Sequence, residues 1–499
     1  MAALACCGSV RAAQSRQTTL SGFADATGQN DASAGLLEAI RAAPPSYAFA
    51  TPLRQVYVDE GTFRIASEAD LSGYDVQLIG AGGIIVPSLG PGGGSVIKST
   101  SGILELIGVD FDGGSDQPKD ATATTWIIFV GNPQSYMRRV RIDGCTFRNC
   151  TASDGTLRVN GAKVTHVIYA RGVAQLDLLR NTVENCSGAA VFLNNVAEFN
   201  SLGNRWIGTD WYTFNIASGS TGIIDGDTFN SNKPTGVYWG GAINTVNAQG
   251  RIPNKNIVVR NCIFSGHYSY GAVVRLQSDN GITCERNTFL NCDRGSLAHA
   301  GGGLSAIRVS TWNPRGLRSS VSAQNVEIRN NRALLGLGAG SYRAFIYVDN
   351  VAETVARNFK ITGNVCRSPD AANYFTAGIL VNGRRSGFDE VSILDNDCEL
   401  YMTTVSPLAG GIAIAAADVR GLVDHVTLGG NRVKNLHRRT GAPQTCYQIG
   451  PYVDNVHIIR ANRASGGYYG LRTVRETDRT ILGIRDQVFD DCIVSTLLT

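Results

Sequence analysis

The chain has 499 residues, of which 43% are hydrophobic and 17% charged, with 58 Gly and 14 Pro. This balance is typical of a folded chain that turns often, and it excludes a disordered one. The formal net charge of +4 gives no support for a nucleic-acid partner, and the sequence has no apolar run of the roughly 18 residues that a membrane-spanning helix needs. We therefore expect neither nucleic acid nor a membrane as a partner.

The chain begins with two segments that differ from the rest. Residues 1–18 lack the basic region of a secretory signal and form a candidate anchor. Residues 19–110 contain a stretch with helical spacing of apolar residues at 33–43, followed by predicted strands at 55–65, 76–83 and 104–113. We expect this segment to supply a cap and the first coils of a larger body, residues 111–499, because a stacked fold must cover its open end.

A short phrase recurs through the body of the chain: a small polar residue or Cys, one spacer and an apolar residue. It occurs at Cys145–Phe147, Asn181–Val183, Asn204–Trp206, Asp227–Phe229, Cys262–Phe264 and Asn287–Phe289, and in weaker form at Asn331, Asn364, Asn396, Asn431 and Asn462. The shortest spacing is 23 residues, which accommodates three short strands and three turns. The sequence therefore predicts an all-β fold: a right-handed parallel β-helix of about 11–13 coils with a short N-terminal capping helix.

The residues of this phrase have expected roles in the scaffold. Asn, Asp and Gly tolerate left-handed φ, so we expect the first residue of each phrase to form the bend. Stacked Asn side chains also hydrogen-bond along a ladder. Cys150, Cys186 and Cys292 occupy equivalent places and are expected to fill the core, which argues against a disulfide framework. No Cys or His spacing predicts a metal site, and we expect no cofactor.

A second strand follows each phrase, and its alternation separates inward from outward residues. The predicted outward columns contain Phe192, Asn215, Tyr238, Arg275, Arg308, Tyr347 and Leu380, and then Asn194, Gln277, Ser310, Asp349 and Asn382. Insertions fall only before and after this second strand, for example at 293–303 and 311–323. Insertions on one face usually mark a binding face, so we predict a groove with this sheet as its floor.

The order of the N-terminal elements resembles the start of the pectate-lyase-like superfamily. The resemblance is carried by Asn30-Asp31, the 33–43 helix, Val56-Tyr-Val-Asp-Glu-Gly-Thr-Phe-Arg-Ile65 and Leu78-Ile-Gly-Ala-Gly82. It is similar in particular to phage tailspike and tail-fibre proteins, which implies a homotrimer and a bacterial surface polysaccharide bound in a groove. The catalytic motifs of polygalacturonases and calcium pectate lyases are missing: Gly266-His267-Tyr268 stands without its partner motifs.

Paired carboxylates would be needed for glycoside hydrolysis, about 5–9.5 Å apart, and neighbouring coils lie about 4.8 Å apart. The candidate catalytic residues are Asp279, Asp293, Asp210 and Asp349, with Asp279 and Asp293 the preferred pair. The alternative is that these carboxylates satisfy turns.

Sugar binding would use aromatic rings, arginines and amides. The candidate substrate-binding residues are Trp211, Tyr212, Tyr238, Tyr268, Arg275, Gln277, Arg308 and Tyr347. The alternative for about half of the rings is a place in the core, and Trp206 and Trp239 have inward register.

These observations lead to an expected function with two alternatives. We expect a phage tail-type receptor-binding protein, located in the virion tail and attached there or at the baseplate through its N-terminus. It would recognise a bacterial surface polysaccharide, with depolymerisation by a hydrolase or lyase reaction as a further activity. The alternatives are a secreted, non-viral polysaccharide lyase or glycoside hydrolase, and a non-catalytic structural or adhesive protein, because the fold alone does not choose among them.

Overall fold

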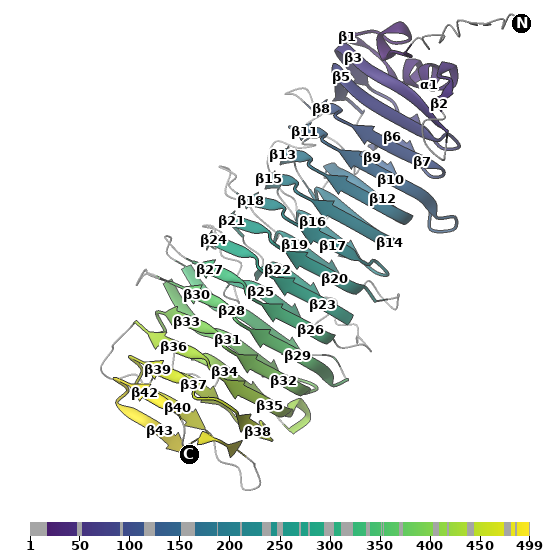
Figure 1. The fold of residues 1–499 in the computed structure, drawn as a ribbon. Helices are drawn as coiled ribbons and strands as arrows, with labels where there is room; N and C mark the ends of the chain where they lie inside the picture. Colours follow the sequence, from purple (N-terminus) through teal and green to yellow (C-terminus); the bar gives the residue numbers. More distant parts are fainter. Residues whose placement is uncertain are drawn as a thin grey trace, which may run out of the picture.

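The computed structural model describes residues 17–46, 52–89, 93–113, 125–150, 165–186, 188–209, 212–231, 241–246, 253–268, 271–277, 280–293, 304–310, 323–335, 340–350, 352, 354–368, 373–402, 409–416, 419–436, 444–473, 481–484 and 487–498. The chain is a right-handed parallel β-helix, as predicted, and its coils stack along one long axis (Figure 1). Among the named strands, the pairing of β2 (Pro45–Ser46) with β3 (Leu53–Ile65) is antiparallel, and the other pairings are parallel.

The N-terminal end is covered by a helix, as the sequence predicted. Helix α1 (Ser33–Ala42) follows β1 (Thr27–Asp31) and buries Leu36, Ala39 and Ile40. It lies at the N-terminal end of the stack, next to β3 (Figure 1). A 3-10 turn, η1 (Leu20–Gly22), and strand β5 (Val76–Pro87) complete this end. The helix thus protects the edge of the first coil from pairing with another chain.

Each coil contributes a strand to three parallel sheets. The first sheet carries the recurring phrase. Within the described residues it begins with β1 and the second halves of β3 and β5 and continues with β8 (Asp110–Asp112), β11 (Thr146–Arg148), β13 (Thr182–Cys186), β15 (Arg205–Thr209), β18 (Thr228–Ser231), β21 (Ile263–His267), β24 (Thr288–Asp293), β27 (Arg332–Leu334), β30 (Val365–Arg367), β33 (Asp397–Leu400), β36 (Arg432–Asn435), β39 (Arg463–Ser465) and β42 (Val488–Asp490). The described strands thus form more coils than the predicted 11–13.

The second sheet follows the first in each coil. Its strands are β4 (Ala69–Asp70), β6 (Gly94–Ser99), β9 (Thr125–Val130), the first halves of β12 (Thr165–Leu179) and β14 (Val191–Leu202), β16 (Phe214–Ala217), β19 (Ile243–Val246), β22 (Ala272–Gln277), β25 (Leu304–Ser310), β28 (Gly340–Asn350), β31 (Asn373–Gly383), β34 (Gly410–Ala416), β37 (Thr445–Ile449), β40 (Tyr469–Thr473) and β43 (Val494–Leu498).

The third sheet closes each coil. Its strands are the first halves of β3 and β5, then β7 (Ile103–Ile107), β10 (Met137–Asp143), the second halves of β12 and β14, β17 (Gly222–Asp225), β20 (Lys255–Arg260), β23 (Asn280–Glu285), β26 (Gln324–Arg329), β29 (Ala356–Thr362), β32 (Phe388–Leu394), β35 (Val423–Gly429), β38 (Val456–Ile458) and β41 (Ile481–Leu482). A second 3-10 turn, η2 (Val419–Gly421), precedes β35.

The apolar residue of the recurring phrase fills the interior. Phe229, Phe264 and Phe289 are buried and stack with ring centroids 4.9 Å apart, one per coil. Phe111 and Phe147 stack in the same way at 4.8 Å. Offset stacking adds to the area that each ring buries, so identical rings in register stabilise the coil spacing.

The first residue of the phrase forms a buried amide ladder, which confirms the predicted stacking of Asn. In Asn364, Oδ1 accepts hydrogen bonds from N and Nδ2 of Asn331 at 3.0 and 2.9 Å. Its Nδ2 donates to the carbonyl of Ile328 and to Oδ1 of Asn396, both at 2.9 Å. The ladder members are Asn181, Asn204, Asp227, Asn287, Asn331, Asn364, Asn396, Asn431 and Asn462, and the ladder ends on Gln487.

The predicted backbone conformation of these ladder residues was wrong. Left-handed φ belongs to the residue immediately before each phrase except the one at Asn462, namely at Gly144, Arg180, Gly203, Gly226, Asn261, Arg286, Asn330, Gly363, Asp395 and Gly430. The bend is made there because the next residue must turn its side chain inward to reach the coils on either side. The turn and the ladder are therefore two adjacent positions with separate requirements.

One member of the ladder carries a carboxylate. Asp227 accepts hydrogen bonds from the backbone N of Asn204 at 2.8 Å and from Nε1 of Trp206 at 2.9 Å. Burial raises the pKa of Asp227 to about 6, although these donors and Ser201 act in the opposite direction. The indole N–H of Trp206 is a donor only, so a carboxylate oxygen can accept it where an amide NH2 could not.

Candidate functional site

The outward side chains of the second sheet form one continuous column. Its register runs through Phe129, Tyr169, Phe192, Asn215, Asn244, Arg275, Arg308 and Tyr347, which we call the outer row. The residue between Asn215 and Arg275 in this column is Asn244. The predicted column placed Tyr238 there, so the predicted position of Tyr238 was wrong. The register shows the reason: β19 begins at Ile243, after the long insertion that contains Tyr238, which itself lies outside the described residues.

The N-terminal part of the outer row is an aromatic stack. Rings of Phe129 and Tyr169 lie 5.2 Å apart with 19° between their planes, and those of Tyr169 and Phe192 lie 5.2 Å apart at 29°. Trp126 packs edge-on against Phe129 at 5.6 Å. All four residues are partly exposed on the outside of the coil. A stack of rings in register at the surface is unlike the core rings, because it leaves ring surface for a ligand.

Next to this stack lies a histidine that is unsuited to acid catalysis. The Nδ1 atom of His166 accepts the N–H of Ala189 at 3.1 Å, and the ring meets Phe192 at 6.2 Å. Burial lowers the pKa of His166 to about 4. The imidazole is therefore neutral near pH 7 and acts as a hydrogen-bond acceptor within the wall of the coil.

Amides follow the rings along the row. Nδ2 of Asn244 donates to Oδ1 of Asn215 at 3.2 Å, and both residues are buried. Among the described residues, Oδ1 of Asn244 has no hydrogen-bond partner. An unpaired buried acceptor costs free energy.

The C-terminal part of the row carries an arginine, a tyrosine and an acid. The guanidinium of Arg308 lies 5.0 Å from the ring centre of Tyr347, and its Nη2 is 2.9 Å from Oδ2 of Asp349. Asp349 is 1% exposed and Tyr347 is 0% exposed. Across the described part of the chain, Oδ1 of Asp349 has no hydrogen-bond partner. Arg275 and Gln277 are also buried, so this end of the predicted groove floor is covered.

The remaining predicted site residues divide into two groups. Tyr212 is buried, and Tyr268 is a core residue, 2% exposed, with its hydroxyl 3.5 Å from the carbonyl oxygen of Phe229. Trp206 is buried as its register indicated. Asp210, Trp211, Asp279 and Trp239 lie outside the described residues, and the backbone of Asp293 ends β24 in the first sheet. The preferred pair, Asp279 and Asp293, therefore stays a prediction.

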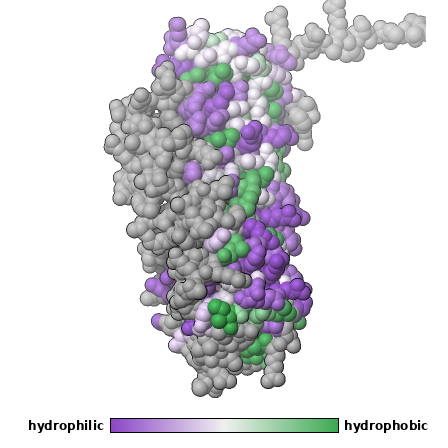
Figure 2. Space-filling model, turned by 90° about the vertical axis from the view of Figure 1, so that its left-hand side faces the viewer, coloured by the Kyte–Doolittle hydropathy of each residue, from purple (hydrophilic) through white to green (hydrophobic). Residues whose placement is uncertain are grey.

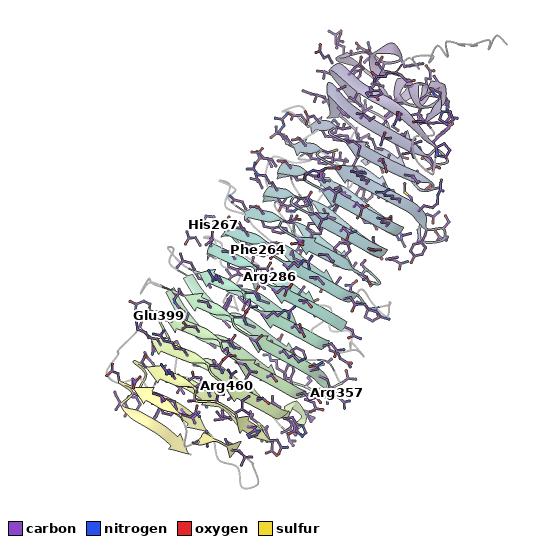
Figure 3. The ribbon with its side chains drawn as sticks, in the orientation of Figure 1. Phe264, His267, Arg286, Arg357, Glu399 and Arg460 are labelled. Atoms are coloured by element: carbon purple, nitrogen blue, oxygen red, sulfur yellow. The ribbon has the colours of Figure 1, made fainter. Side chains whose placement is uncertain are left out.

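His267 does not align with the buried cysteines. A register shift between β21 and β24 places it opposite Asp293 and not opposite Cys292. Figure 3 shows His267 at the outer edge of its coil and Phe264 within it. Cys150, Cys186 and Cys292 are buried, as predicted.

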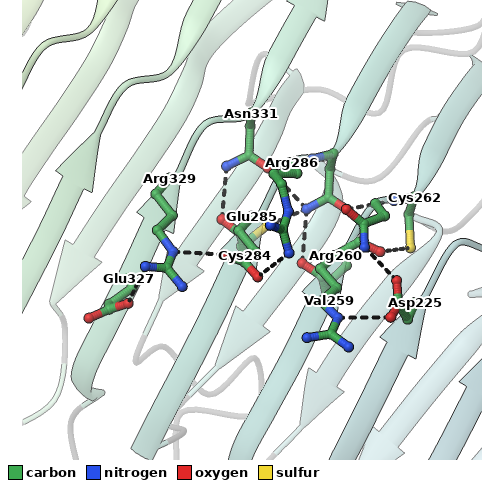
Figure 4. Close-up of polar contacts among 12 residues, drawn as sticks. Asp225, Val259, Arg260, Cys262, Cys284, Glu285, Arg286, Glu327, Arg329 and Asn331 are labelled. Atoms are coloured by element: carbon green, nitrogen blue, oxygen red, sulfur yellow. Dashed lines mark hydrogen bonds and ion pairs between the residues drawn. The ribbon is translucent and has the colours of Figure 1, made fainter.

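The outer face of the third sheet is neutralised by its own ion pairs. Glu285 accepts from Nη2 of Arg286 at 3.0 Å and from Nε of Arg329 at 2.7 Å (Figure 4). One coil earlier, Arg260 Nε lies 2.8 Å from Asp225. On the face shown in Figure 2, the described residues are mostly hydrophilic and hydrophobic residues form small separate patches.

Within the described residues, no group of three or more His, Cys, Asp or Glu is placed to hold a metal ion. In the same residues, no helix has the length and apolar character needed to cross a membrane.

Comparison with known proteins places the backbone near several solved structures. It is similar to ORF18 of Geobacillus virus E2, with a TM-score of 0.43 and 13% identity over 71% of this chain and 62% of that one. It is similar to the Streptococcus pneumoniae surface protein and adhesin PfbA, with a TM-score of 0.45 and 13% identity over 97% and 99%.

The third comparison is the catalytic unit of a GH87 alpha-1,3-glucanase from Streptomyces thermodiastaticus, with a TM-score of 0.42 and 13% identity over 97% and 69%. No family model matches the chain, and no curated protein matches it. At this identity and these TM-scores the similarities carry no argument about activity. The functional argument therefore rests on the side chains of the outer row.

Proposed function

We propose that this protein binds a bacterial surface polysaccharide along the outer row, as a receptor-binding protein of the phage tail type. The observation that carries the proposal is the partly exposed stack of Phe129, Tyr169 and Phe192, continued in register by Asn215 and Asn244. Rings offer flat apolar surface to the C–H faces of sugars, and amides both donate and accept hydrogen bonds with hydroxyls.

The dimensions suit a chain-like ligand. The row spans eight coils, or seven spacings of ~4.8 Å, which is roughly 34 Å. Its chemistry changes from rings through amides to the Arg308–Asp349 pair. A linear polymer lying parallel to the long axis would contact the partly exposed rings of Phe129, Tyr169 and Phe192. Beyond these rings the row is buried apart from the half-buried Arg308, so the rings are its accessible part.

The binding test compares two tyrosines. Tyr169→Ala removes the central ring of the stack, whereas Tyr136→Ala removes an exposed tyrosine outside the outer row. A lost stacking contact of about 1.4 kcal/mol lowers affinity roughly tenfold. We expect that loss for Tyr169→Ala alone, measured by calorimetry with purified capsular polysaccharides and lipopolysaccharide O-chains. Equal affinities for both variants and the parent chain would contradict the proposed binding surface.

Depolymerisation is a second candidate function, and Asp349, which is 1% exposed, is the predicted catalytic carboxylate whose contacts the structure describes. Its carboxylate is held by Arg308 through one oxygen, and the other oxygen has no partner among the described residues. The same polysaccharides are incubated with the protein and assayed for new reducing ends and for unsaturated products, which separate hydrolase from lyase chemistry. Asp349→Asn is expected to abolish cleavage and to preserve binding; an unchanged rate would remove Asp349 from the catalytic candidates.

The tail-type assignment is tested by measuring the molar mass of the protein by light scattering and comparing it with the 53.1 kDa of one chain. We expect three times that mass, the homotrimer implied by the tailspike resemblance. A monomer that still binds polysaccharide would favour a secreted enzyme or an adhesive protein over a virion protein.

A further inference from the structure

Two arginines lie next to each other on the outer face of the first sheet, near its C-terminal end. Arg432 begins β36 and Arg463 begins β39, and the two are direct partners in the register of these parallel strands. Both are exposed, whereas the residues that follow them, Val433 and Ala464, are buried. Both guanidinium groups therefore extend outward from the same face, on backbones that lie one coil, about 4.8 Å, apart.

The neighbouring charges of this face are matched with each other. Nη2 of Arg367 lies 2.5 Å from Oδ2 of Asp397, and Nζ of Lys434 lies 2.7 Å from Oε1 of Glu399. Figure 3 shows Glu399 at the outer edge of this sheet. Asp397 is the register partner of Arg432 on its other side, but its carboxylate is engaged by Arg367. Within the described residues, neither arginine of the pair forms an ion pair of its own.

The charge balance around the pair is positive. From β30 to β42 the outward residues of this sheet include four cations and three carboxylates, and the two ion pairs above take two of each. Two guanidinium groups and one carboxylate, that of Asp490, are left. Asp490 is the register partner of Ser465, which lies two residues after Arg463 on the same outward side.

Two adjacent guanidinium groups create a need for an anion. Like charges that face each other across paired strands destabilise a sheet. An oxyanion between them removes the repulsion and accepts charge-assisted hydrogen bonds from both, because the planar N–H groups of guanidinium match the oxygens of phosphate and carboxylate. Arg205 provides the contrast within the same register column: it is exposed as well, but its partners are Thr182 and Thr228.

We propose that Arg432 and Arg463 form an oxyanion-binding site, which takes the phosphate or the carboxylate group of a ligand. Each guanidinium donates N–H groups to the oxygens of the bound group, and the partly exposed Ser465 offers a hydroxyl beside Arg463. Since both arginines are exposed, a charged group at the edge of a larger ligand reaches them directly. The site lies on the first sheet and the outer row on the second, so the proposal does not depend on polysaccharide binding by the outer row.

The test is modification of exposed arginines by phenylglyoxal, followed by mass-spectrometric peptide mapping of the folded full-length protein. The reaction is run in sodium chloride, in inorganic phosphate and in acetate, at equal pH and ionic strength so that general screening is the same. We expect phosphate to slow the modification of Arg432 and Arg463 roughly fivefold relative to chloride and to leave Arg205 unchanged. Comparable slowing in acetate assigns the site to carboxylates as well, and slowing in phosphate alone assigns it to phosphate groups.

Two variants separate the pair from its surroundings. Arg463→Gln removes one guanidinium, so phosphate should no longer protect Arg432, whereas Arg205→Gln should leave the protection as it is. Asp490→Asn removes the remaining carboxylate and should strengthen the protection. Equal modification of Arg432 and Arg463 in all three salts would overturn the proposal. Equal protection of Arg205 would overturn it too, because that result shows an ionic effect without a site.

Discussion

The amide ladder predicts that replacing one buried nitrogen atom by oxygen has a large, pH-dependent effect on the free energy of unfolding. In Asn364→Asp an oxygen replaces Nδ2, which now donates to the carbonyl of Ile328 and to Oδ1 of Asn396 at 2.9 Å each. The new oxygen would face two acceptors in a position that is 0% exposed. Two buried hydrogen bonds are lost, and a buried charge appears whenever the carboxyl group ionises.

The natural carboxylate of the ladder sets the magnitude. The pKa of Asp227 is raised from 3.8 to about 6, which corresponds to about 3 kcal/mol against the ionised folded form. Asp227 has help from Trp206 and Ser201 that position 364 lacks, so the cost there is at least as large. We expect Asn364→Asp to destabilise the folded state by about 3–6 kcal/mol at pH 7.

The sign of the pH dependence follows from the raised pKa. The folded variant binds its proton more tightly than the unfolded chain does, so its stability falls as the pH rises through about 4 and beyond. Urea unfolding followed by circular dichroism at pH 4 and pH 7 measures this loss. The matched control is Asn358→Asp, in an exposed amide ladder where Nδ2 of Asn358 donates to Asn325 at 2.9 Å, and its effect should stay below about 1 kcal/mol. Equal effects at the two positions, or no change with pH, would refute the reasoning.

Two further predictions concern the scaffold. Since Asp227 has a raised pKa in the folded state, the parent chain should lose about 3 kcal/mol of stability relative to Asp227→Asn as pH rises from about 3 to about 7, measured by urea unfolding. Parallel curves for the two chains would contradict this expectation. Gly80→Ala should destabilise by about 3 kcal/mol or more in the same assay, because its Cβ would lie 1.8 Å from the carbonyl oxygen of Gly108, whereas Gly22→Ala, whose nearest atom is 3.6 Å away, should change little.

The fold could be predicted because the repeated residues determine how successive turns of the backbone stack. A phrase that returns at a minimum of 23 residues, with an Asn that must contact its equivalents, allows few arrangements other than stacked coils. The same reasoning missed the left-handed residue. The left-handed position is occupied by Gly, Asn, Asp and Arg, including Arg180 and Arg286. Because no single residue type marks it, the position could not be recognised from the sequence.

The candidate site was less predictable, because outward residues are not constrained by packing. Phe129 and Tyr169 were missed since the alignment of second strands began at Ala190, beyond two coils with long insertions. The alternation of inward and outward residues in 125–130 and 165–170 identifies Phe129 and Tyr169 as outward residues. Tyr238 was misplaced for the same reason: an insertion shifts the register by an amount that the sequence does not state. Burial of Tyr347 and Arg275 depends on tertiary contacts that no local pattern carries.

The amide ladder has a consequence for how such a chain can change its length. From Asn331 to Asn431 each rung accepts hydrogen bonds from the coil before it and donates them to the coil after it, so the Asn rungs of this run are interchangeable as junctions. Removing residues 364–395 would join Gly363 to Asn396 and leave Asn331 with an identical acceptor. Gains and losses of whole coils preserve the interior, whereas a single inserted residue inside a rung disrupts it. The molecule can thus be lengthened or shortened in modules, and with it the outer row.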